Sequence, residues 1–362
     1  MHILFSVHFN SPQGGLHENV FSTVAYSLDK GYKTTVLCKE GPFAERLRRK
    51  GSQVIITDFE SIDNTVEKVL FEKVSNFDVI HTHPGPSRKV AMILADRLDL
   101  PIVMTFHGMW LDSIIRYSDK LSAIITVSEG VKDFLKNKVN KNSHKFVVIP
   151  NGVDRKTFKP PKSLKLKKNK LNISLVTRLD KDKEFIIKLF YEALSFTNEN
   201  YKSEVNWTIV GTGTELEKIK KEVLTITQAK HKVNFVGWQT GKKLKTYYQK
   251  SDIVIAPGRS ALEAMACGKP VIAIGSKKYN GLVTKNNWLE GVYSNFGGFG
   301  NKFDDYVRGT IEKELEILIE NQQIRKDLGK LGLLITEQFY DERVINGKIV
   351  ALYDIVKKER EL

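Results

Sequence analysis

The stretch from residue 251 to residue 275, SDIVIAPGRSALEAMACGKPVIAIG, constrains the fold of this 362-residue chain more than any other. An apolar run at 253–256 ends in a Pro-Gly turn, and a second apolar run at 271–274 follows a Gly-Lys-Pro turn. Two short apolar runs joined by a helix-length segment predict parallel strands linked by a helix. Such sheets bind ligands outside the carboxyl ends of their strands, so Gly258 and the helix after it predict a seat for an anion or a nucleotide.

Glu263, near the start of that helix, has two interpretations. Ser260 and Glu263 stand at the spacing of a capping box, in which the serine caps the helix and the glutamate bonds back to the N–H of the cap. A carboxylate has several lone pairs, so the same side chain can also accept hydrogen bonds from a ligand. The spacing by itself favours the capping interpretation.

The alternation of strands and helices continues along the chain. Apolar runs predict strands at 2–7, 33–38, 53–57, 79–82, 102–106, 123–127, 146–149, 171–177, 205–210 and 233–236. Helical patterns lie between them, for example at 18–30, 43–50 and 89–98. This order predicts an α/β fold with parallel, doubly wound sheets, and the length suits two domains that each bury a core.

Composition limits the cellular setting and the partners. The two cysteines, Cys38 and Cys267, are far apart in sequence, which predicts reduced structural thiols. The first residues are too poor in apolar side chains for a signal peptide or a membrane span, so we expect a soluble cytoplasmic protein. A formal net charge of +15 and a pI near 9.5 indicate attraction to an anion, such as a nucleic acid, a membrane or a phosphorylated ligand.

Residues 262–273, LEAMACGKPVIA, resemble the donor-site segment of the family 4 glycosyltransferases, retaining sugar transferases of the GT-B type. In that family the glutamate of this segment holds the ribose hydroxyls of a sugar nucleotide. The resemblance covers essentially the whole chain. It implies two Rossmann-like domains with a cleft between them, and donor binding by Gly258, Arg259, Ser260 and Glu263.

The domain boundary is predicted at PNGVD, residues 150–154, which resembles the boundary motif of the family. Asn-Gly predicts a turn, with Gly152 at positive φ. We expect an acceptor-side domain at 1–158, a linker at 159–170 and a nucleotide-sugar domain at 171–340; residues 160–170 of the linker hold five lysines and no acid. The last segment, 341–362, should be an amphipathic helix that crosses back to the first domain, with apolar positions Val344, Ile345, Ile349, Leu352, Tyr353 and Val356.

Two cations follow the first strand of the second domain. Arg178 and Lys183 resemble an arginine and a lysine of the family, and cations here would stabilise the charge of a departing nucleoside diphosphate. Without the resemblance they are a solvated surface pair. Asp180 and Asp182 form a DxD, the metal-diphosphate signature of the other large glycosyltransferase fold, but beside two cations we interpret them as capping the next helix and matching its dipole.

Glycine-rich turns supply further expected donor contacts. Gly211 and Gly213 form a G-x-G without the third glycine of a dinucleotide fingerprint, so a nicotinamide cofactor is not expected. They resemble a family turn at the donor site, and in the first domain Gly14 and Gly15 resemble the loop that faces the donor phosphates and the acceptor. A Gly-Gly pair alone is usually only a turn.

Two other segments complete the expected donor site. Trp238 stands where members of the family contact the nucleobase, so it either stacks on the base or caps the core. Residues 279–284 occupy the place of a glycine-rich diphosphate loop, which implies donor contacts from Gly281, Leu282 and Val283.

Histidines follow two strands of the first domain. His81 and His83 could supply half of a metal site, but the sequence indicates no third ligand nearby, so no metal is expected. The segment TFHG resembles a family segment whose histidine lies close to the donor sugar. His107 is therefore our candidate polar contact at the reaction centre, and its alternative role is a hydrogen-bonded core histidine.

One feature departs from the family pattern. Family members usually carry two glutamates eight positions apart, and the position eight residues before Glu263 is Ile255. The first glutamate contacts the donor sugar, so the identity of that sugar is open. Arg259 stands near where an acid is customary, which would suit an acidic donor sugar.

The sequence therefore predicts a metal-independent, retaining glycosyltransferase that needs no cofactor. It would move a sugar from a nucleoside diphosphate, with UDP as the expected nucleotide, to a cell-envelope glycan or a lipid-linked acceptor. Three alternatives stay open: a non-catalytic GT-B partner subunit, a UDP-sugar 2-epimerase on the same fold, and a nucleic-acid binder, which only the charge suggests.

The segment 129–145 suggests a membrane contact. It reads as a helix with apolar positions and five lysines, Lys132, Lys136, Lys138, Lys141 and Lys145. A basic amphipathic face predicts peripheral binding to anionic lipid on the inner face of the cell membrane. The alternative is a solvated lysine face.

Overall fold

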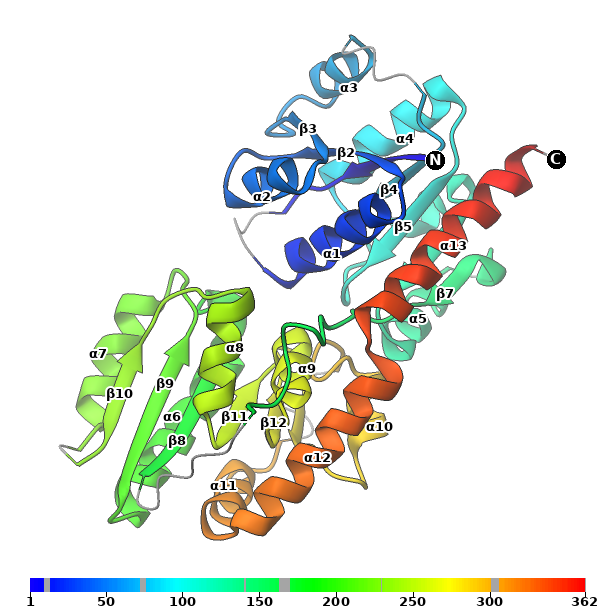
Figure 1. Cartoon of the computed structure of the whole chain (residues 1–362). Helices are drawn as coiled ribbons and strands as arrows, with labels where there is room; N and C mark the ends of the chain where they lie inside the picture. Colours follow the sequence, from blue (N-terminus) through cyan, green and yellow to red (C-terminus); the bar gives the residue numbers. More distant parts are fainter. Residues whose placement is uncertain are drawn as a thin grey trace. The chain divides into compact units, whose positions relative to one another are not determined.

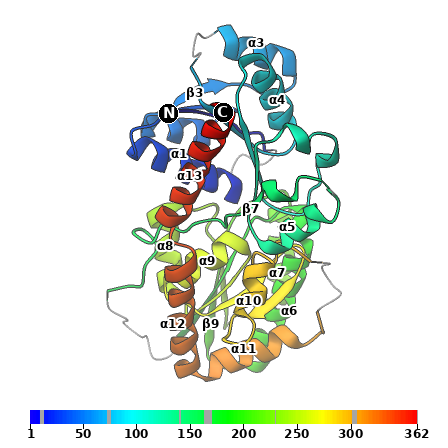
Figure 2. The same cartoon turned by 90° about the vertical axis from the view of Figure 1, so that its right-hand side faces the viewer.

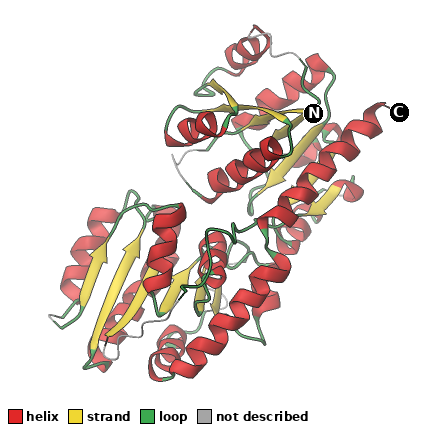
Figure 3. Cartoon of the chain, viewed as in Figure 1, coloured by secondary structure: helices red, strands yellow, loops and turns green. Residues whose placement is uncertain are grey.

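The computed structural model describes residues 1–9, 14–71, 76–139, 141–162, 170–228, 230–300 and 306–361. The chain divides into two compact units, each built from one sheet with helices packed on both faces (Figures 1 and 3). Unit 1 comprises Met1–Gly152 and Glu342–Leu362, and unit 2 comprises Val153–Asp341.

Unit 1 contains a seven-stranded parallel sheet of order β3-β2-β1-β4-β5-β6-β7. Its strands are β1 (His2–Ser6), β2 (Lys33–Cys38), β3 (Gln53–Ile56), β4 (Val79–Thr82), β5 (Ile102–Phe106), β6 (Ala123–Thr126) and β7 (Phe146–Val148). The order reverses between β1 and β4. This is the doubly wound arrangement that the alternating pattern predicted, and the strand bounds agree to within one residue.

The helices of unit 1 form a layer on each face of the sheet. They are α1 (Gly15–Asp29), α2 (Pro42–Lys50), α3 (Ile62–Phe71), α4 (Pro86–Leu98), α5 (Glu129–Lys136) and α13 (Glu342–Glu361), with short 3₁₀ turns η1 (Ile114–Arg116), η2 (Ser118–Lys120) and η3 (Ser143–Lys145). Ile3 and Phe5 of β1 pack with α1, α2 and α13, whereas Leu4 packs with α3, α4 and α5. Because both faces of the strand are covered, its three central side chains are all apolar.

The last helix, α13, packs beside α1 (Figures 1 and 2). Of its predicted apolar positions, Ile345, Ile349, Tyr353 and Val356 are buried in the core, but Val344 is 58% exposed. The Asn346 side chain accepts a 3.0 Å hydrogen bond from Thr23 of α1, so polar contacts also fix the register of α13.

Unit 2 contains a six-stranded sheet of order β10-β9-β8-β11-β12-β13. Its strands are β8 (Lys170–Val176), β9 (Glu204–Val210), β10 (Lys232–Phe235), β11 (Ile253–Ala256), β12 (Val271–Ile274) and β13 (Tyr279–Leu282), of which only β13 is antiparallel. The helices are α6 (Glu184–Asn200), α7 (Leu216–Ile226), α8 (Gly241–Lys250), α9 (Gly258–Ala266), α10 (Trp288–Tyr293), α11 (Thr310–Glu320) and α12 (Gln322–Phe339), with the 3₁₀ turn η4 (Lys181–Lys183). The order reverses between β8 and β11.

The chain passes from unit 1 to unit 2 earlier than we expected. Residues 153–158 group with unit 2, where Val153 forms a bridge to Asp341 and Phe158 lies in the core. Gly152 does not adopt positive φ; a Cβ on it would lie 2.6 Å from Cα of Glu342, so glycine is needed for close packing. Of the expected linker, 163–169 lies outside the described residues and Lys170 already belongs to β8.

The predicted basic helix at 129–145 is also shorter than expected. It ends at Lys136, and its apolar residues Val131 and Leu135 are completely buried in the core of unit 1. The apolar face of α5 therefore packs on the sheet and is not available to a membrane.

Candidate functional site

The switch point of unit 2 brings together most of the charged residues predicted to bind the donor. Arg178 and Lys183 follow β8, and the segment from Gly258 to Glu263 follows the adjacent strand β11. Both loops lie at the carboxyl edge of the sheet. This is the position at which doubly wound α/β sheets bind their ligands.

Glu263 does not belong to a capping box. Helix α9 begins at Gly258 with Pro257 at the N-cap, and no side chain caps it. Strand β11 runs directly into the helix through the extended Pro257, so the helix starts earlier than the Ser260 pattern predicted. Glu263 thus lies in the second turn, and the capping interpretation is wrong.

The Glu263 carboxylate is instead held by two buried side chains. Its Oε1 accepts a 2.9 Å hydrogen bond from Nε of Arg259, and its Oε2 accepts a 3.3 Å bond from the hydroxyl of Tyr248 on α8. The side chains of Arg259 and Glu263 are 12% and 7% exposed. Burial and the Glu263 charge raise the pKa of Tyr248, so its hydroxyl remains a donor. A carboxylate has several lone pairs and can accept more than one donor, as binding of ribose hydroxyls would require.

Arg178 and Lys183 are held by the two aspartates between them. Arg178 pairs with Asp180 and, at 3.1 Å, with Asp182, and Lys183 pairs with Asp182 at 2.8 Å. Asp180 also accepts a 2.9 Å hydrogen bond from the Thr214 N–H and makes no cap to η4. The capping part of our interpretation is therefore wrong, although Asp182 does lie in the first turn of η4, where it matches the helix dipole. Both acids position the two cations.

Lys183 reaches across the sheet edge. Its Nζ donates a 3.3 Å hydrogen bond to Ser276, which follows β12. Burial lowers the pKa of Lys183, and the hydrogen bond and charge of Asp182 oppose that shift. For Asp182, burial acts to raise the pKa, but the contacts with Lys183 and Arg178 outweigh it and the pKa is lowered. A half-buried ammonium beside an aspartate is a preorganised partner for an anion.

Gly211 and Gly213 serve the packing of the loops. A Cβ on Gly211 would lie 1.9 Å from the carbonyl oxygen of Thr177, and one on Gly213 would lie 2.3 Å from the carbonyl carbon of Leu179. The loops after β8 and β9 thus approach backbone to backbone, which requires these glycines whether or not a donor binds.

Trp238, after β10, is partly buried, and its Nε1 has no hydrogen-bond partner among the described residues.

The expectation of a diphosphate loop at 279–284 is wrong. Residues Tyr279–Leu282 form strand β13, and the Leu282 N–H donates a 2.8 Å hydrogen bond to Glu314. The Val283 N–H donates to the Val271 carbonyl at 2.9 Å. These two amides are thus occupied, and Gly281 has φ of +69° within the strand. A donor contact from this segment stays a prediction.

In unit 1, three histidines form a row at the carboxyl ends of β4 and β5. Nε2 of His107 lies 3.2 Å from Nδ1 of His83, and the rings of His83 and His81 are 5.2 Å apart. His81 is hydrogen bonded to the Tyr353 hydroxyl of α13 at 2.5 Å and to Thr105 at 2.7 Å. Burial lowers the pKa of His107 to about 4 and that of His81 to about 3, so both are neutral at pH 7.

His107 is the member of this row that is partly exposed, whereas His81 and His83 are buried. Nε2 of His83 has no hydrogen-bond partner among the described residues. Gly14 and Gly15 lie at the N-terminus of α1, and Gln13 beside them lies outside the described residues. A Cβ on Gly15 would meet no atom within 4 Å.

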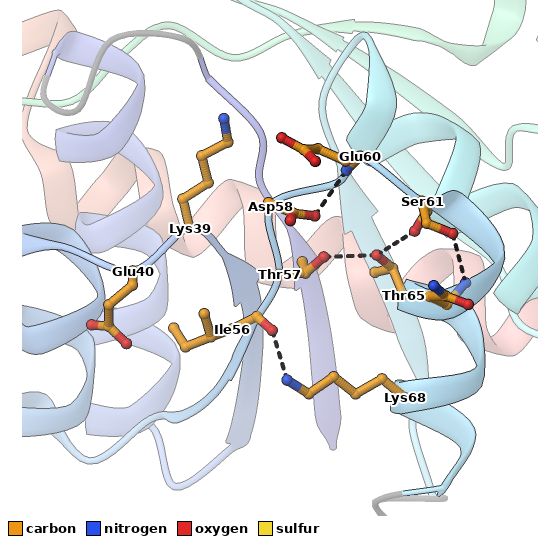
Figure 4. A pocket seen from close by; sticks show the side chains of 10 residues that line it. Lys39, Glu40, Ile56, Thr57, Asp58, Glu60, Ser61, Thr65 and Lys68 are labelled. Carbon is orange, nitrogen blue, oxygen red and sulfur yellow. Dashed lines mark hydrogen bonds between the residues drawn. The ribbon is translucent and has the colours of Figure 1, made fainter.

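A groove of about 640 Å³ opens at the carboxyl ends of β2 and β3 (Figure 4). Lys39 and Glu60 face it from opposite sides, and neither side chain has a hydrogen-bond or ion-pair partner in the described part of the chain. Asp58 accepts the Glu60 N–H at 2.9 Å, and Lys68 donates to the Ile56 carbonyl at 2.8 Å. The lining is polar and of mixed charge.

Sequence reasoning missed Tyr248 and Ser276, which hold Glu263 and Lys183. Both are distant in sequence from the residues they contact, and no local pattern marks them. Within the described ranges, no group of three or more His, Cys, Asp or Glu side chains is placed to hold a metal ion. Among the same residues, no helix is long and apolar enough to cross a membrane.

The comparisons with known proteins agree with this geometry. Residues 156–332 match the family model of the glycosyl transferases group 1, and residues 14–157 match the model of Glycosyltransferase Family 4. The UDP-Gal:alpha-D-GlcNAc-diphosphoundecaprenol alpha-1,3-galactosyltransferase of Escherichia coli is 26% identical over 296 residues, 74% of this chain and 74% of that protein.

Solved structures share the fold over nearly the whole chain. A glycosyltransferase from Rickettsia africae ESF-5 has a TM-score of 0.77 at 18% identity and covers 98% of both chains. Anabaena HepE in complex with UDP has a TM-score of 0.75 at 20% identity, over 97% of this chain and 99% of that one. The chain belongs to the family 4 glycosyltransferases of the GT-B type and is a glycosyltransferase.

Proposed function

We propose that this glycosyltransferase transfers a sugar from a UDP-sugar, with retention of configuration, to a lipid-linked glycan acceptor of the cell envelope at the cytoplasmic face of the membrane. The observation that carries the donor assignment is the buried carboxylate of Glu263 beside the cations of Arg178 and Lys183 at one switch point. A carboxylate suits ribose hydroxyls, and cations suit a diphosphate.

The leaving diphosphate explains the arrangement after β8. Negative charge grows on phosphate oxygens as the sugar bond breaks, and fixed cations lower the barrier only if they stay in place. Asp180 and Asp182 hold Arg178 and Lys183 there before the donor arrives. HepE binds UDP, which supports the choice of nucleotide.

The acceptor assignment rests on unit 1. The E. coli relative acts on a sugar linked to diphosphoundecaprenol, which supports a lipid-linked acceptor. We place the glycan part of the acceptor in the polar groove of Lys39, Asp58 and Glu60, whose mixed charges suit hydroxyl groups. His107 would contact the reacting sugars as a neutral imidazole.

Release of UDP tests the proposal. The purified protein would be incubated with UDP-glucose, UDP-galactose, UDP-N-acetylglucosamine or UDP-glucuronate, with and without a polyprenyl-diphosphate-linked saccharide. UDP-glucuronate is included because Arg259 stands near where an acid is customary. We expect acceptor-dependent UDP release with one donor, and an α-linked product from an α-linked donor.

Three results would contradict the proposal. A product whose sugar has the inverted configuration would rule out the retaining mechanism. Epimerised donor without transfer would indicate an isomerase. A melting temperature that no UDP-sugar raises would indicate a partner subunit without a donor site, because binding to the folded state must stabilise it.

A further inference from the structure

The connection between β5 and β6 presents two large apolar side chains to solvent. Trp110 is 56% exposed and Ile115 is 62% exposed, and Arg116 beside them is also exposed. Single exposed apolar residues are common, but here a tryptophan and an isoleucine are exposed only five positions apart on one connection. We call residues 108–117 the docking loop.

A buried carboxylate clamps the docking loop. Oδ2 of Asp112 accepts hydrogen bonds from the Gly85 N–H at 2.9 Å, from Nε of Arg88 at 2.8 Å and from the Tyr117 hydroxyl at 3.1 Å. The side chains of Arg88 and Asp112 are only 14% and 9% exposed. The Arg88 guanidinium also lies 4.3 Å from the centre of the Tyr117 ring.

The backbone of the docking loop is strained. Asp112 and Ser113 have φ of 44° and 58°, in the left-handed region that residues other than glycine rarely adopt. Such strain persists only where the surroundings impose it. Ile114 points into the core and is completely buried, while Ile115 points outward. The strained backbone and the buried Arg88–Asp112 ion pair thus hold the loop in a conformation that keeps Trp110 and Ile115 away from the core.

The segment that contains and follows the docking loop is rich in basic residues. Residues 107–145 contain seven lysines and arginines against four acids, and one of these acids is the buried Asp112. Glu129 is paired with Lys132 at 3.0 Å. Lys145 of η3 donates hydrogen bonds to the Ser118 and Asp119 carbonyls of η2. These bonds hold η3 against the turn that directly follows the docking loop. Lys138 and Lys141 remain exposed.

We propose that the docking loop inserts Trp110 and Ile115 into the headgroup region of an anionic bilayer, with Arg116, Lys138 and Lys141 contacting the lipid phosphates. Tryptophan favours the membrane interface, and cations beside inserted apolar side chains attract anionic lipid. The excess of positive charge favours this occupant over a protein surface. The loop begins next to His107, so it would bring a lipid-linked acceptor to unit 1; only this purpose rests on the proposed function.

Vesicle binding tests the proposal without an acceptor. The full chain would be sedimented with vesicles of phosphatidylcholine alone or mixed with phosphatidylglycerol, at low and at physiological salt. We expect binding to the anionic vesicles that weakens with salt. Trp110→Ser with Ile115→Ser should weaken it roughly tenfold to a hundredfold, and Arg116→Gln or Lys138→Gln each about fivefold at low salt.

A matched variant controls for loss of apolar surface. Leu224→Ser with Val307→Ser removes two side chains of unit 2 that are 78% and 73% exposed, and it should bind vesicles like the wild type. Melting temperatures should be unchanged in both double variants, since the four side chains are exposed. Brominated lipid should quench tryptophan fluorescence in the wild type and much less in Trp110→Phe.

Several results would overturn the proposal. These are equal binding to neutral and anionic vesicles, no binding to either, or the same loss in both double variants. Loss of oligomers in the docking-loop variant without any vesicle binding would assign the surface to a protein partner. The protein could also bind vesicles through the docking loop and yet release no UDP. That result would contradict the proposed function but support the membrane-docking proposal.

Discussion

Glu263 shows how a single carboxylate can be read wrongly from its neighbours in sequence. The letters S-A-L-E fit a capping box, but strand β11 enters α9 through Pro257, and the true cap has no side-chain bond. What the side chain does depends on Arg259 and Tyr248, and Tyr248 is fifteen residues away. The sequence identified Glu263 as a candidate site residue, but it did not identify the hydrogen-bond partners of its carboxylate.

We expect Glu263→Gln to weaken UDP binding roughly tenfold to a hundredfold, because neutral hydrogen bonds to the ribose replace charge-assisted ones worth about 1 to 3 kcal/mol more. The variant should also lower the free energy of unfolding by about 1 to 3 kcal/mol, since Arg259 loses a buried charged partner. Calorimetric titration of UDP well below the melting temperature separates the two effects.

Tyr248→Phe is the matched control for Glu263→Gln. It removes one hydrogen bond to the carboxylate and keeps the charge, so UDP affinity should change less than about threefold while stability falls by about 1 kcal/mol. If both variants lose UDP affinity equally, Glu263 does not contact the nucleotide.

Lys183 should give the reaction an alkaline limit. Burial lowers its pKa from the usual 10.5, so the ammonium that would face the diphosphate is lost as pH rises through that lowered value. We expect Lys183→Ala to reduce kcat about a hundredfold to a thousandfold. Lys183→Arg, whose charge does not titrate in this range, should retain more activity and move the alkaline limit upward. If the activity of wild type and of Lys183→Arg falls at the same alkaline pH, this assignment is contradicted.

At the scale of elements, strands were predicted well wherever an apolar run was closed by turn residues. β11 and β12 have the expected bounds because burial on both faces makes their sequences continuously apolar. β4 and β5 also have the expected bounds, although β4 ends in His81-Thr82 and β5 contains Thr105. β13 was missed because residues 279–284 were interpreted as the diphosphate loop of the family, and its strand conformation comes from pairing with β12.

The glycines of the predicted donor site divide into two kinds, which mutation should separate. Gly211→Ala would place a Cβ 1.9 Å from the Thr177 carbonyl oxygen, at φ of +155°, so we expect a loss of several kcal/mol or failure to fold. Gly15→Ala meets no atom within 4 Å in helix α1 and should be neutral or stabilising by up to about 1 kcal/mol.

Urea unfolding of the two alanine variants checks this difference. Equal midpoints would mean that the loops after β8 and β9 can separate at little cost. In that case the backbone packing described here does not determine the need for glycine, and ligand contact becomes the better explanation for Gly211.

At the scale of the whole molecule, the buried histidines make unit 1 sensitive to acid. His81 and His107 have folded-state pKa values of about 3 and about 4, below the unfolded value of 6.5. Below pH 6.5 the unfolded chain therefore binds more protons, and stability falls as pH decreases toward those values. Each histidine contributes about 1.4 kcal/mol per pH unit at most.

Denaturant midpoints at pH 6.5 and at about pH 5 measure this loss, in a range where carboxylates of ordinary pKa stay charged. His81→Gln keeps hydrogen-bonding capacity without a titrating ring, so its stability should fall less steeply with acid than that of the wild type. A wild type whose stability does not change over this range would show that the histidines protonate without leaving their sites.

The return of α13 to unit 1 has a consequence for synthesis on the ribosome. The chain completes unit 2 before it makes the helix that covers the α1 side of the unit 1 sheet. Until residues 342–361 leave the exit tunnel, the sites of Ile345, Ile349 and Tyr353 are vacant and the apolar face beneath them is a target for chaperones. A released chain that is truncated after residue 341 should accordingly show a protease-resistant unit 2 while unit 1 is readily cleaved.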